Sequence, residues 1–234
     1  SPGPSPGPSP GPAPGPAPGP SPGPSPGPGP APGPVPIAPK EWTCTVDTSI
    51  STGTQHKGAT SVTYVSDDVG AVRYETVGHP STLTLFNENP PKNMQLDSTG
   101  TKCVAWCPPS GTYFNPIQVG TGKNGTSKGV QDGDTWSWTD NLFIIPMDHK
   151  HLTLKSGAVP TTLLEEITPF GGKCIANATQ TFHDDFKPSV ADASKFTVTN
   201  LASCPKASNC QNGYESLRIT DDVERLLLSL GDKN

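Results

Sequence analysis

The sequence predicts a mainly β protein, in which an antiparallel head domain follows an extended proline-rich segment. Proline occupies every even position from Pro2 to Pro36. Through most of the remaining chain, apolar and polar residues alternate with a period of two, and turn-forming residues interrupt the runs at short intervals. One C-terminal stretch instead follows helical spacing. We therefore expect three parts: a rod over residues 1–39, a disulfide-stapled β head over 40–212 and an amphipathic helix over 213–234.

The first segment is expected to form a polyproline II rod. Each proline fixes φ near −65° and removes a backbone donor, and it pushes the preceding residue toward extended geometry. Polyproline II needs no internal hydrogen bonds and rises ~3.1 Å per residue, so the segment could reach about 110 Å. Glycine recurs mostly every fourth position rather than every third, which excludes a collagen triple helix.

The alternating pattern predicts a series of strands in the head. Residues 62–65 and 72–76 alternate on either side of a turn at residues 67–70, as in a hairpin. Short runs of this kind favour antiparallel sheet, and we expect a two-sheet sandwich or half-barrel. Further strands are expected around Leu83 and Leu85, Met94 and Leu96, 102–107, Trp136 and Trp138, 142–145, Leu152 and Leu154, 173–182 and 195–199.

The C-terminal stretch is expected to form a helix of about three turns. Asp221 with Glu224 three residues later is a capping pattern, and Gly231 is a stop signal. This helix packs either on its own sheet or on a neighbouring subunit. The apolar residues at helical spacing are Ile219, Val223, Leu226, Leu227 and Leu230.

The cysteines indicate a secreted protein. The chain has 6 cysteines, and none of them forms a CxxC pair. Two N-glycosylation sequons, at Asn124 and Asn177, agree with this compartment. In an extended segment Cys103 and Cys107 would lie about 13 Å apart, so they should have different partners unless the chain turns between them. Cys204 and Cys210 could close a local loop, or both could lie beside the strand that carries Cys103 and Cys107.

Charge and motifs narrow the functional classes. The net charge of −5 provides no basic patch for nucleic acid, and no window approaches the ~20 apolar residues of a transmembrane span. No serine-hydrolase, metalloprotease or phosphate-loop motif is present, so we expect neither an enzyme nor a cofactor. Trp136 and Trp138 share one strand face, where they form either core or the wall of a lipid pocket.

Two clusters contain residue types that can bind metals. His149 and His151 lie on one strand face, with His183 and the two following aspartates as a possible complement. Asp132 and Asp134 offer two carboxylates in a turn, but the rest of a calcium loop is absent. Solvated strand ends and turns explain both clusters equally well, so no metal is expected.

The order of features in the head resembles the ependymin-related secreted glycoproteins. The features are Cys44 at the first strand, the turn 67–70, a cysteine after Lys102, the Thr-Trp-Ser-Trp run at 135–138, the Gly-Gly-Lys-Cys run at 171–174, residues 191–196 and the last two cysteines. The resemblance implies two stacked antiparallel sheets, N-glycans, dimerisation and a pocket for a lipid. It also implies three disulfides, Cys44–Cys174, Cys103–Cys210 and Cys107–Cys204.

The rod resembles the hydroxyproline-rich glycoproteins of algal and plant cell walls, in which single small residues separate the prolines. That resemblance implies hydroxylation and O-glycosylation of the even-numbered prolines, and such sugars would stiffen the rod. These residues are Pro2, Pro4, Pro6, Pro8, Pro10, Pro12, Pro14, Pro16, Pro18, Pro20, Pro22, Pro24, Pro26, Pro28, Pro30, Pro32, Pro34 and Pro36.

Two functional hypotheses follow. The first is a secreted structural glycoprotein of the extracellular matrix or cell surface. In this hypothesis subunits self-associate into a fibre, with residues 35–39 of one subunit, or its rod, lying in a groove of the next. The second is an ependymin-like module that binds a lipid or another hydrophobic ligand in its head. The partners expected are therefore other copies of the chain, covalent glycans and, in the second case, a lipid.

Overall fold

The computed structural model describes residues 2–7, 9, 11, 15, 34–52, 55–109, 115–120, 129–142, 145–156, 158–168, 174–208 and 210. The chain divides into two units, Ser1–Ala31 and Pro32–Asn234. The second unit contains all the strands found in the described residues and is called the head below. The polyproline II conformation of the rod and the domain boundaries given above stay predictions. The expected C-terminal helix lies outside the described residues.

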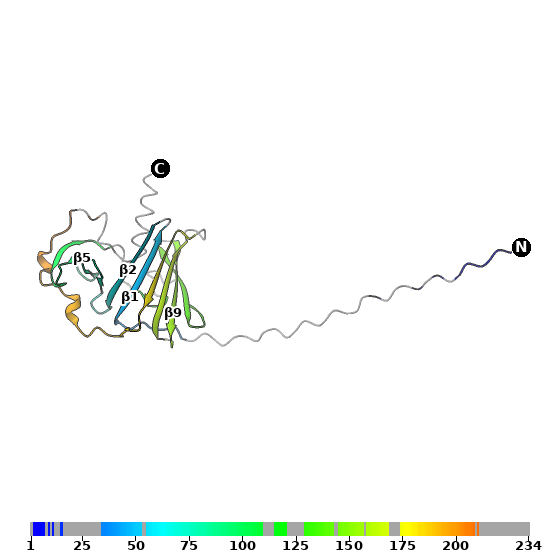
Figure 1. Ribbon diagram of the computed structural model, residues 1–234, viewed down its shortest axis with the longest axis horizontal. Coiled ribbons are helices and arrows are strands. Elements are labelled where there is room, and N and C mark those ends of the chain that lie inside the picture. Colours follow the sequence, from blue (N-terminus) through cyan, green and yellow to red (C-terminus); the bar gives the residue numbers. More distant parts are fainter. Residues whose placement is uncertain are drawn as a thin grey trace. The chain divides into compact units, whose positions relative to one another are not determined.

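The head is built on one antiparallel sheet of 11 strands, in the order β6-β5-β4-β3-β2-β1-β11-β10-β9-β8-β7. Figure 1 shows the long strands β1, β2 and β9 in a row, with β5 curled away from them. The strands are β1 (Glu41–Thr52), β2 (Gln55–Ser66), β3 (Ala71–Thr76), β4 (Thr82–Leu85), β5 (Lys92–Leu96), β6 (Cys103–Cys107), β7 (Val130–Asp132), β8 (Thr135–Leu142), β9 (Ile145–Lys155), β10 (Val159–Ile167) and β11 (Ala176–Phe182).

The sheet consists of two meanders joined at a single ladder. Strands β1 to β6 follow one another across the sheet, and so do β7 to β11; the first and last strands, β1 and β11, pair in the middle. Their register runs from Val46 opposite Phe182 to Thr52 opposite Ala176. The mainly β, antiparallel prediction is therefore confirmed. The expected pair of separate sheets is not found, because β1 pairs with β2 along its whole length and with β11 from Val46 to Thr52, which makes one continuous sheet.

Opposite faces of this sheet carry two separate cores. The first lies on the face of the long strands that presents Trp42, Val46 and Leu152, and the second lies on the other face, over β3 to β6, around Leu83 and Met94. Strand β3 contributes to both, because successive side chains of a strand point to opposite faces. Consistent with this, its first three residues, Ala71, Val72 and Arg73, are all buried.

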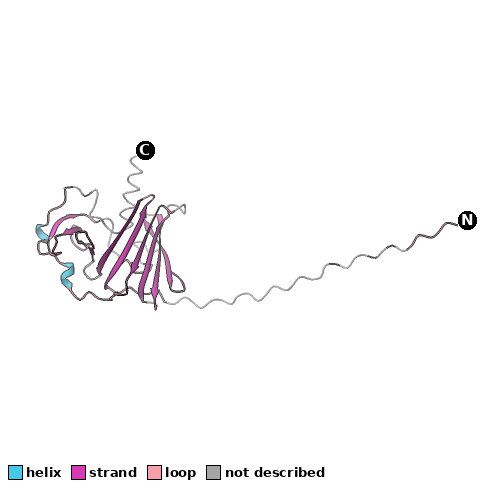
Figure 2. Ribbon diagram, viewed as in Figure 1, coloured by secondary structure: helices cyan, strands magenta, loops and turns pink. Residues whose placement is uncertain are grey.

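The segment after β11 covers the second core. It contains two short 3₁₀ helices, η2 (Ala193–Phe196) and η3 (Leu201–Ser203), which Figure 2 shows beside the shorter strands. Phe196 is buried in the cluster. The buried Arg73 guanidinium donates hydrogen bonds to the carbonyl oxygens of Gly100 (3.0 Å) and Lys195 (3.1 Å). The expected strand at 195–199 is wrong, because residues 193–196 form η2 and turn Phe196 into the core.

The edge strand β6 is covered by the chain that returns alongside it. The Asn200 side chain accepts a hydrogen bond from the Cys103 amide (2.7 Å) and donates one to the Cys103 carbonyl (2.9 Å), so it satisfies groups that an open edge would leave exposed. A parallel bridge then joins Trp106 to Lys206. Disulfides link Cys103 to Cys204 and Cys107 to Cys210.

This disulfide pairing corrects the one that the ependymin resemblance implied. In a parallel alignment the earlier cysteine of one strand meets the earlier cysteine of the other, which gives Cys103–Cys204 and Cys107–Cys210. Cys44 and Cys174 are free thiols. The β1–β11 register places them near opposite ends of that ladder, about 30 Å apart at ~3.3 Å per residue, so they cannot form a bridge.

We predict that the double variant Cys103→Ser/Cys204→Ser is less stable than the wild type by about 2–4 kcal/mol, because this bridge closes a long loop. The free energy of unfolding would be measured by urea denaturation without reductant. Cys174→Ser removes a thiol that forms no bridge and is the matched control, with an expected change below about 0.5 kcal/mol. Equal stabilities of the double variant and the wild type would contradict the prediction.

Candidate functional site

The candidate site is an apolar pocket at the end of the sheet where β1 begins and β11 ends. Because these strands are antiparallel, the residues before Glu41 and those after Phe182 lie at the same end of the sheet. The turn from β9 into β10 lies at this end as well, since β10 is the next strand beyond β11. The pocket therefore draws its walls from segments that are far apart in the sequence.

One wall is the N-terminal strap, residues 36–39, which two polar side chains hold in place. Gln118 accepts a hydrogen bond from the Ala38 amide (2.9 Å), and its side-chain NH₂ lies 3.4 Å from the Pro36 carbonyl oxygen. The Asn115 side chain donates to the Pro39 carbonyl oxygen (2.9 Å). A proline carbonyl keeps both lone pairs although the ring has no N–H, so donors from elsewhere in the chain can hold a strap of this composition.

Asn115 connects the strap to the core. Its side-chain oxygen accepts a hydrogen bond from the Trp42 indole N–H (3.0 Å), and both side chains are buried. The Trp42 ring stacks on Phe186 with 5.9 Å between ring centroids and meets Phe182 edge-on at 6.0 Å. A buried indole N–H needs a partner, so Asn115 is a structural requirement of this aromatic cluster.

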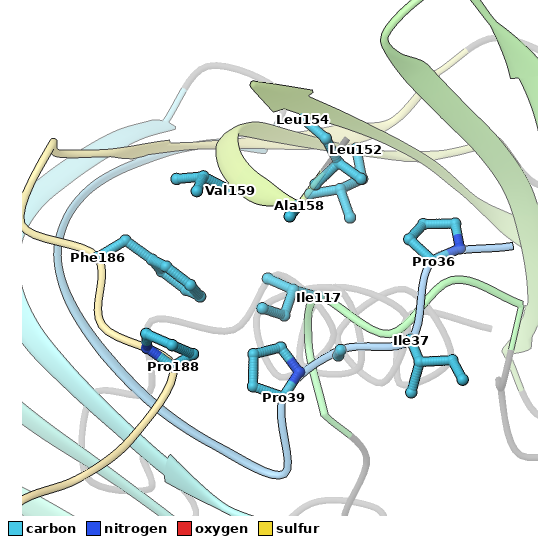
Figure 3. Close-up of a pocket in the computed structure, with 11 residues that line it drawn as sticks. Pro36, Ile37, Pro39, Ile117, Leu152, Leu154, Ala158, Val159, Phe186 and Pro188 are labelled. Atoms are coloured by element: carbon cyan, nitrogen blue, oxygen red, sulfur yellow. The ribbon is translucent and has the colours of Figure 1, made fainter. Parts of the chain in front are cut away.

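The pocket between these walls has a volume of about 310 Å³. Figure 3 shows Phe186 and Pro188 facing Pro36 across it, with Ile117 between them. None of the 11 described residues that line it has a polar side chain. They are Pro36, Ile37, Ala38, Pro39, Ile117, Leu152, Leu154, Ala158, Val159, Phe186 and Pro188.

Asp185 anchors the wall that carries Phe186. Beyond Phe182 the ladder is interrupted, and the Asp185 carboxylate takes the place of a backbone acceptor for the Thr45 amide (3.0 Å) and also binds the Thr45 hydroxyl (2.7 Å). Backbone pairing then resumes between Thr43 and Lys187. Burial acts to raise the pKa of Asp185, but the hydrogen bonds from Thr45 and Cys44 outweigh it and the pKa is lowered.

The same carboxylate controls the free thiol of Cys44. The Cys44 Sγ lies 3.3 Å from Asp185 Oδ1. Burial, with the hydrogen bond to the negatively charged Asp185, raises the pKa of Cys44 to about 12. A thiol of this kind is neutral at physiological pH, so Cys44 is a poor nucleophile and metal ligand.

The tryptophans considered as a pocket wall lie elsewhere. Trp136 and Trp138 are buried in the first core, each only 5% exposed, and neither lines the pocket. Trp138 is opposite Lys150 on β9. On the same face of the sheet, Lys150 forms buried ion pairs with Asp148 (3.2 Å) and Glu165 (3.4 Å). The sequence pattern did not reveal this set of charges.

The polar residues considered as metal sites belong to the outer surface. His149 and His151 share a face as predicted, and their Nδ1 atoms lie 3.0 Å from the Thr139 hydroxyl and 2.8 Å from the Ser137 hydroxyl. His183 is 2.8 Å from Asp47, and the hydrogen bond between them raises the pKa of His183. Within the described residues, no group of three or more His, Cys, Asp or Glu side chains is arranged to hold a metal ion.

The remaining predicted sites have the following positions. Asp132 and Asp134 flank Gly133, whose φ of 58° forms the tight turn between β7 and β8. Asn177 is half-buried in β11, and its glycosylation stays a prediction; Asn124 lies outside the described residues. Pro36, the last proline expected to carry a sugar, contributes to the pocket wall, and the modification of the prolines stays a prediction.

The chain matches no family model and no curated protein. Solved structures to which the chain shows similarity include an uncharacterized conserved protein from Thermus thermophilus, at 13% identity over 72% of this chain and 91% of that chain, with a TM-score of 0.39. A LolA superfamily protein from Nitrosomonas europaea is 8% identical over 70% of this chain and 92% of that chain, with a TM-score of 0.39. A domain described as a candidate outer membrane lipoprotein-sorting protein, from Vibrio parahaemolyticus, is 7% identical over 67% of this chain and 88% of that chain, with a TM-score of 0.24.

The fold bears on the two resemblances given above. The ependymin-related pattern required two stacked sheets and a Cys44–Cys174 bridge, and the structure has neither. The resemblance to the ependymin-related glycoproteins is therefore wrong, and the resemblance of the rod to hydroxyproline-rich glycoproteins is supported by no family model and no curated protein. The hypothesis of a fibre-forming matrix glycoprotein is wrong as well, because residues 36–39 lie against their own head and not in a groove of a neighbouring subunit. The alternative hypothesis of a hydrophobic ligand agrees better with the apolar pocket.

The two disulfides place the head in an oxidising compartment outside the cytosol. This supports the general part of the expected location, and the more specific assignment to an extracellular matrix has no support. Separately, no helix in the described part of the chain is long and apolar enough to cross a membrane.

We predict that Asn115→Ala lowers the free energy of unfolding by about 1–3 kcal/mol, because it leaves the buried Trp42 indole N–H without its acceptor. Urea denaturation followed by tryptophan fluorescence would measure the loss. Gln118→Ala removes the strap contacts and a hydrogen bond to the Val119 carbonyl oxygen but leaves the Trp42 indole paired, so it should cost less than Asn115→Ala. A larger loss for Gln118→Ala would contradict this prediction, because it would show that the strap contacts stabilise the head more than the hydrogen bond to the Trp42 indole does.

We also predict that Cys44 resists alkylation in the folded protein. With a pKa of about 12, the thiolate fraction at pH 8 is about one part in ten thousand, and burial restricts access further. Peptide mass spectrometry after iodoacetamide treatment at pH 8 should show Cys174 modified well before Cys44. Both should react at similar rates in urea, and similar rates in the native protein would contradict the assignment.

Proposed function

We propose that the head binds an uncharged apolar molecule, or the apolar part of a lipid, in the pocket between the strap and the segment after β11. The observation that carries the proposal is the lining, in which every described residue has an apolar side chain. Sites of this kind recognise hydrocarbon by removing it from water, which contributes roughly 25 cal/mol per Å² of apolar area.

The size of the pocket limits the bound group. Small-molecule sites usually measure about 300–1,000 Å³, so a pocket of about 310 Å³ lies at the lower end. A dry cavity about half that size is sufficient for benzene. We therefore expect a short acyl segment or a compact aromatic group, bound with shape selectivity and without a polar side chain that fixes its orientation.

The proposal rests on the pocket and not on the names of the similar structures. It describes binding without a covalent step, and we propose no catalytic activity for the head. Asn115, Gln118 and Asp185 act in it as positioning residues, because they hold the strap and the Phe186 segment on either side of the ligand.

We predict that the full chain binds N-phenyl-1-naphthylamine, an uncharged probe whose fluorescence rises in apolar surroundings, and that decanol displaces it. Ala158 lies in the exposed β9–β10 turn and lines the pocket, so Ala158→Trp should fill the space and weaken probe binding about tenfold or more. Fluorescence titration would measure the dissociation constant.

The control variant is Ala202→Trp, which places the same ring on the exposed helix η3, away from the pocket. It should bind the probe as the wild type does. An absence of probe binding by the wild type, or equal affinities for Ala158→Trp and Ala202→Trp, would show that this pocket is not the binding site.

A further inference from the structure

Exposed apolar side chains gather at the mouth of the pocket. Ile37 is 89% exposed, the most among the exposed large hydrophobic residues of the described chain. Val159, 37% exposed, lies on the opposite side of the pocket lining, and Val35, 44% exposed, precedes the strap. Single exposed apolar residues are common on proteins, but a group at the entrance of an apolar pocket marks an interaction surface.

Among the described residues, the charges next to the pocket-lining segments are balanced, and Phe186 itself is flanked by one acidic residue, Asp185, and one basic residue, Lys187. Lys40, directly after the strap, pairs with Asp68 at 3.5 Å, and Lys155, directly after Leu154, pairs with Asp184 at 3.7 Å. All four side chains are largely exposed, so these pairs contribute little to stability, but they leave no excess positive charge on these two sides. The whole chain carries −5, which would oppose attraction to an anionic surface.

We infer that the mouth of the pocket docks on a neutral, zwitterionic lipid surface, with Ile37 and Val35 inserted among the head groups. An apolar ligand dissolves poorly in water and is concentrated in membranes, so a pocket whose entrance is apolar and electrically balanced can receive it there without passage through water. This inference rests on the proposed function, because it identifies the surface from which the pocket is loaded.

The test uses the full chain and vesicles of phosphatidylcholine, with co-flotation as the measure of binding. Val35 does not line the pocket, so Val35→Glu should weaken vesicle binding about tenfold or more while probe binding in solution stays at the wild-type level. The matched control is Val77→Glu, which changes a residue that is 75% exposed in the turn after β3 and should leave vesicle binding unchanged. Ile37→Glu should reduce vesicle binding further.

The outcomes separate the inference from the proposed function. Wild-type binding to phosphatidylcholine that is insensitive to salt and lost in Val35→Glu supports the inference. It is overturned if Val35→Glu floats with vesicles as well as Val77→Glu does, or if the wild type binds only vesicles that contain phosphatidylglycerol. Probe binding in solution without any vesicle binding also overturns it and leaves the proposed function intact. If the wild type does not bind the probe in solution, the proposed function is rejected.

Discussion

The ladder between β1 and β11 is the constraint on which the rest of the head depends. It joins the two meanders into one sheet, and it is the strand pairing that brings the two ends of the sheet-forming sequence together. Because the pairing is antiparallel, the strap before β1 and the Phe186 segment after β11 emerge at the same end. The pocket is thus a result of topology: its two main walls are the continuations of the paired strands, and the β9–β10 turn completes it.

Side chains replace main-chain partners where this sheet would otherwise be incomplete. Asp185 serves as the acceptor for the Thr45 amide at the interruption after β11, and Asn200 pairs with both backbone groups of Cys103 at the β6 edge. In each case the chain can therefore leave the ladder without an unpaired backbone group. At Asp185 it goes on to form a wall of the pocket, and near Asn200 it covers the second core. Short polar side chains suit this role, since they hydrogen-bond backbone groups locally.

Alternation in the sequence predicted the strands that contain residues 62–65 and 72–76, the turn between them and most of β11. It could not predict which face is buried, because the first core uses one face of the sheet and the second uses the other. The apolar run at 142–145 was expected to be one strand, but β8 ends at Leu142 and β9 begins at Ile145. The pocket was not predictable in the same way: Phe186, Pro188 and Ala158 have no periodic pattern, and nothing in the sequence marks Asn115 as the partner of Trp42.

The meander topology has a consequence for how the head folds. Apart from β1 with β11, neighbouring strands of the sheet are mostly successive hairpin partners, so each half can form from contacts that are close in sequence. The central ladder is different, because its partners Val46 and Phe182 are more than a hundred residues apart and closing that loop costs conformational entropy. The two meanders should therefore form first, and the ladder between β1 and β11 should form late. The pocket, which needs both ends of that ladder, would be among the last features of the head to appear.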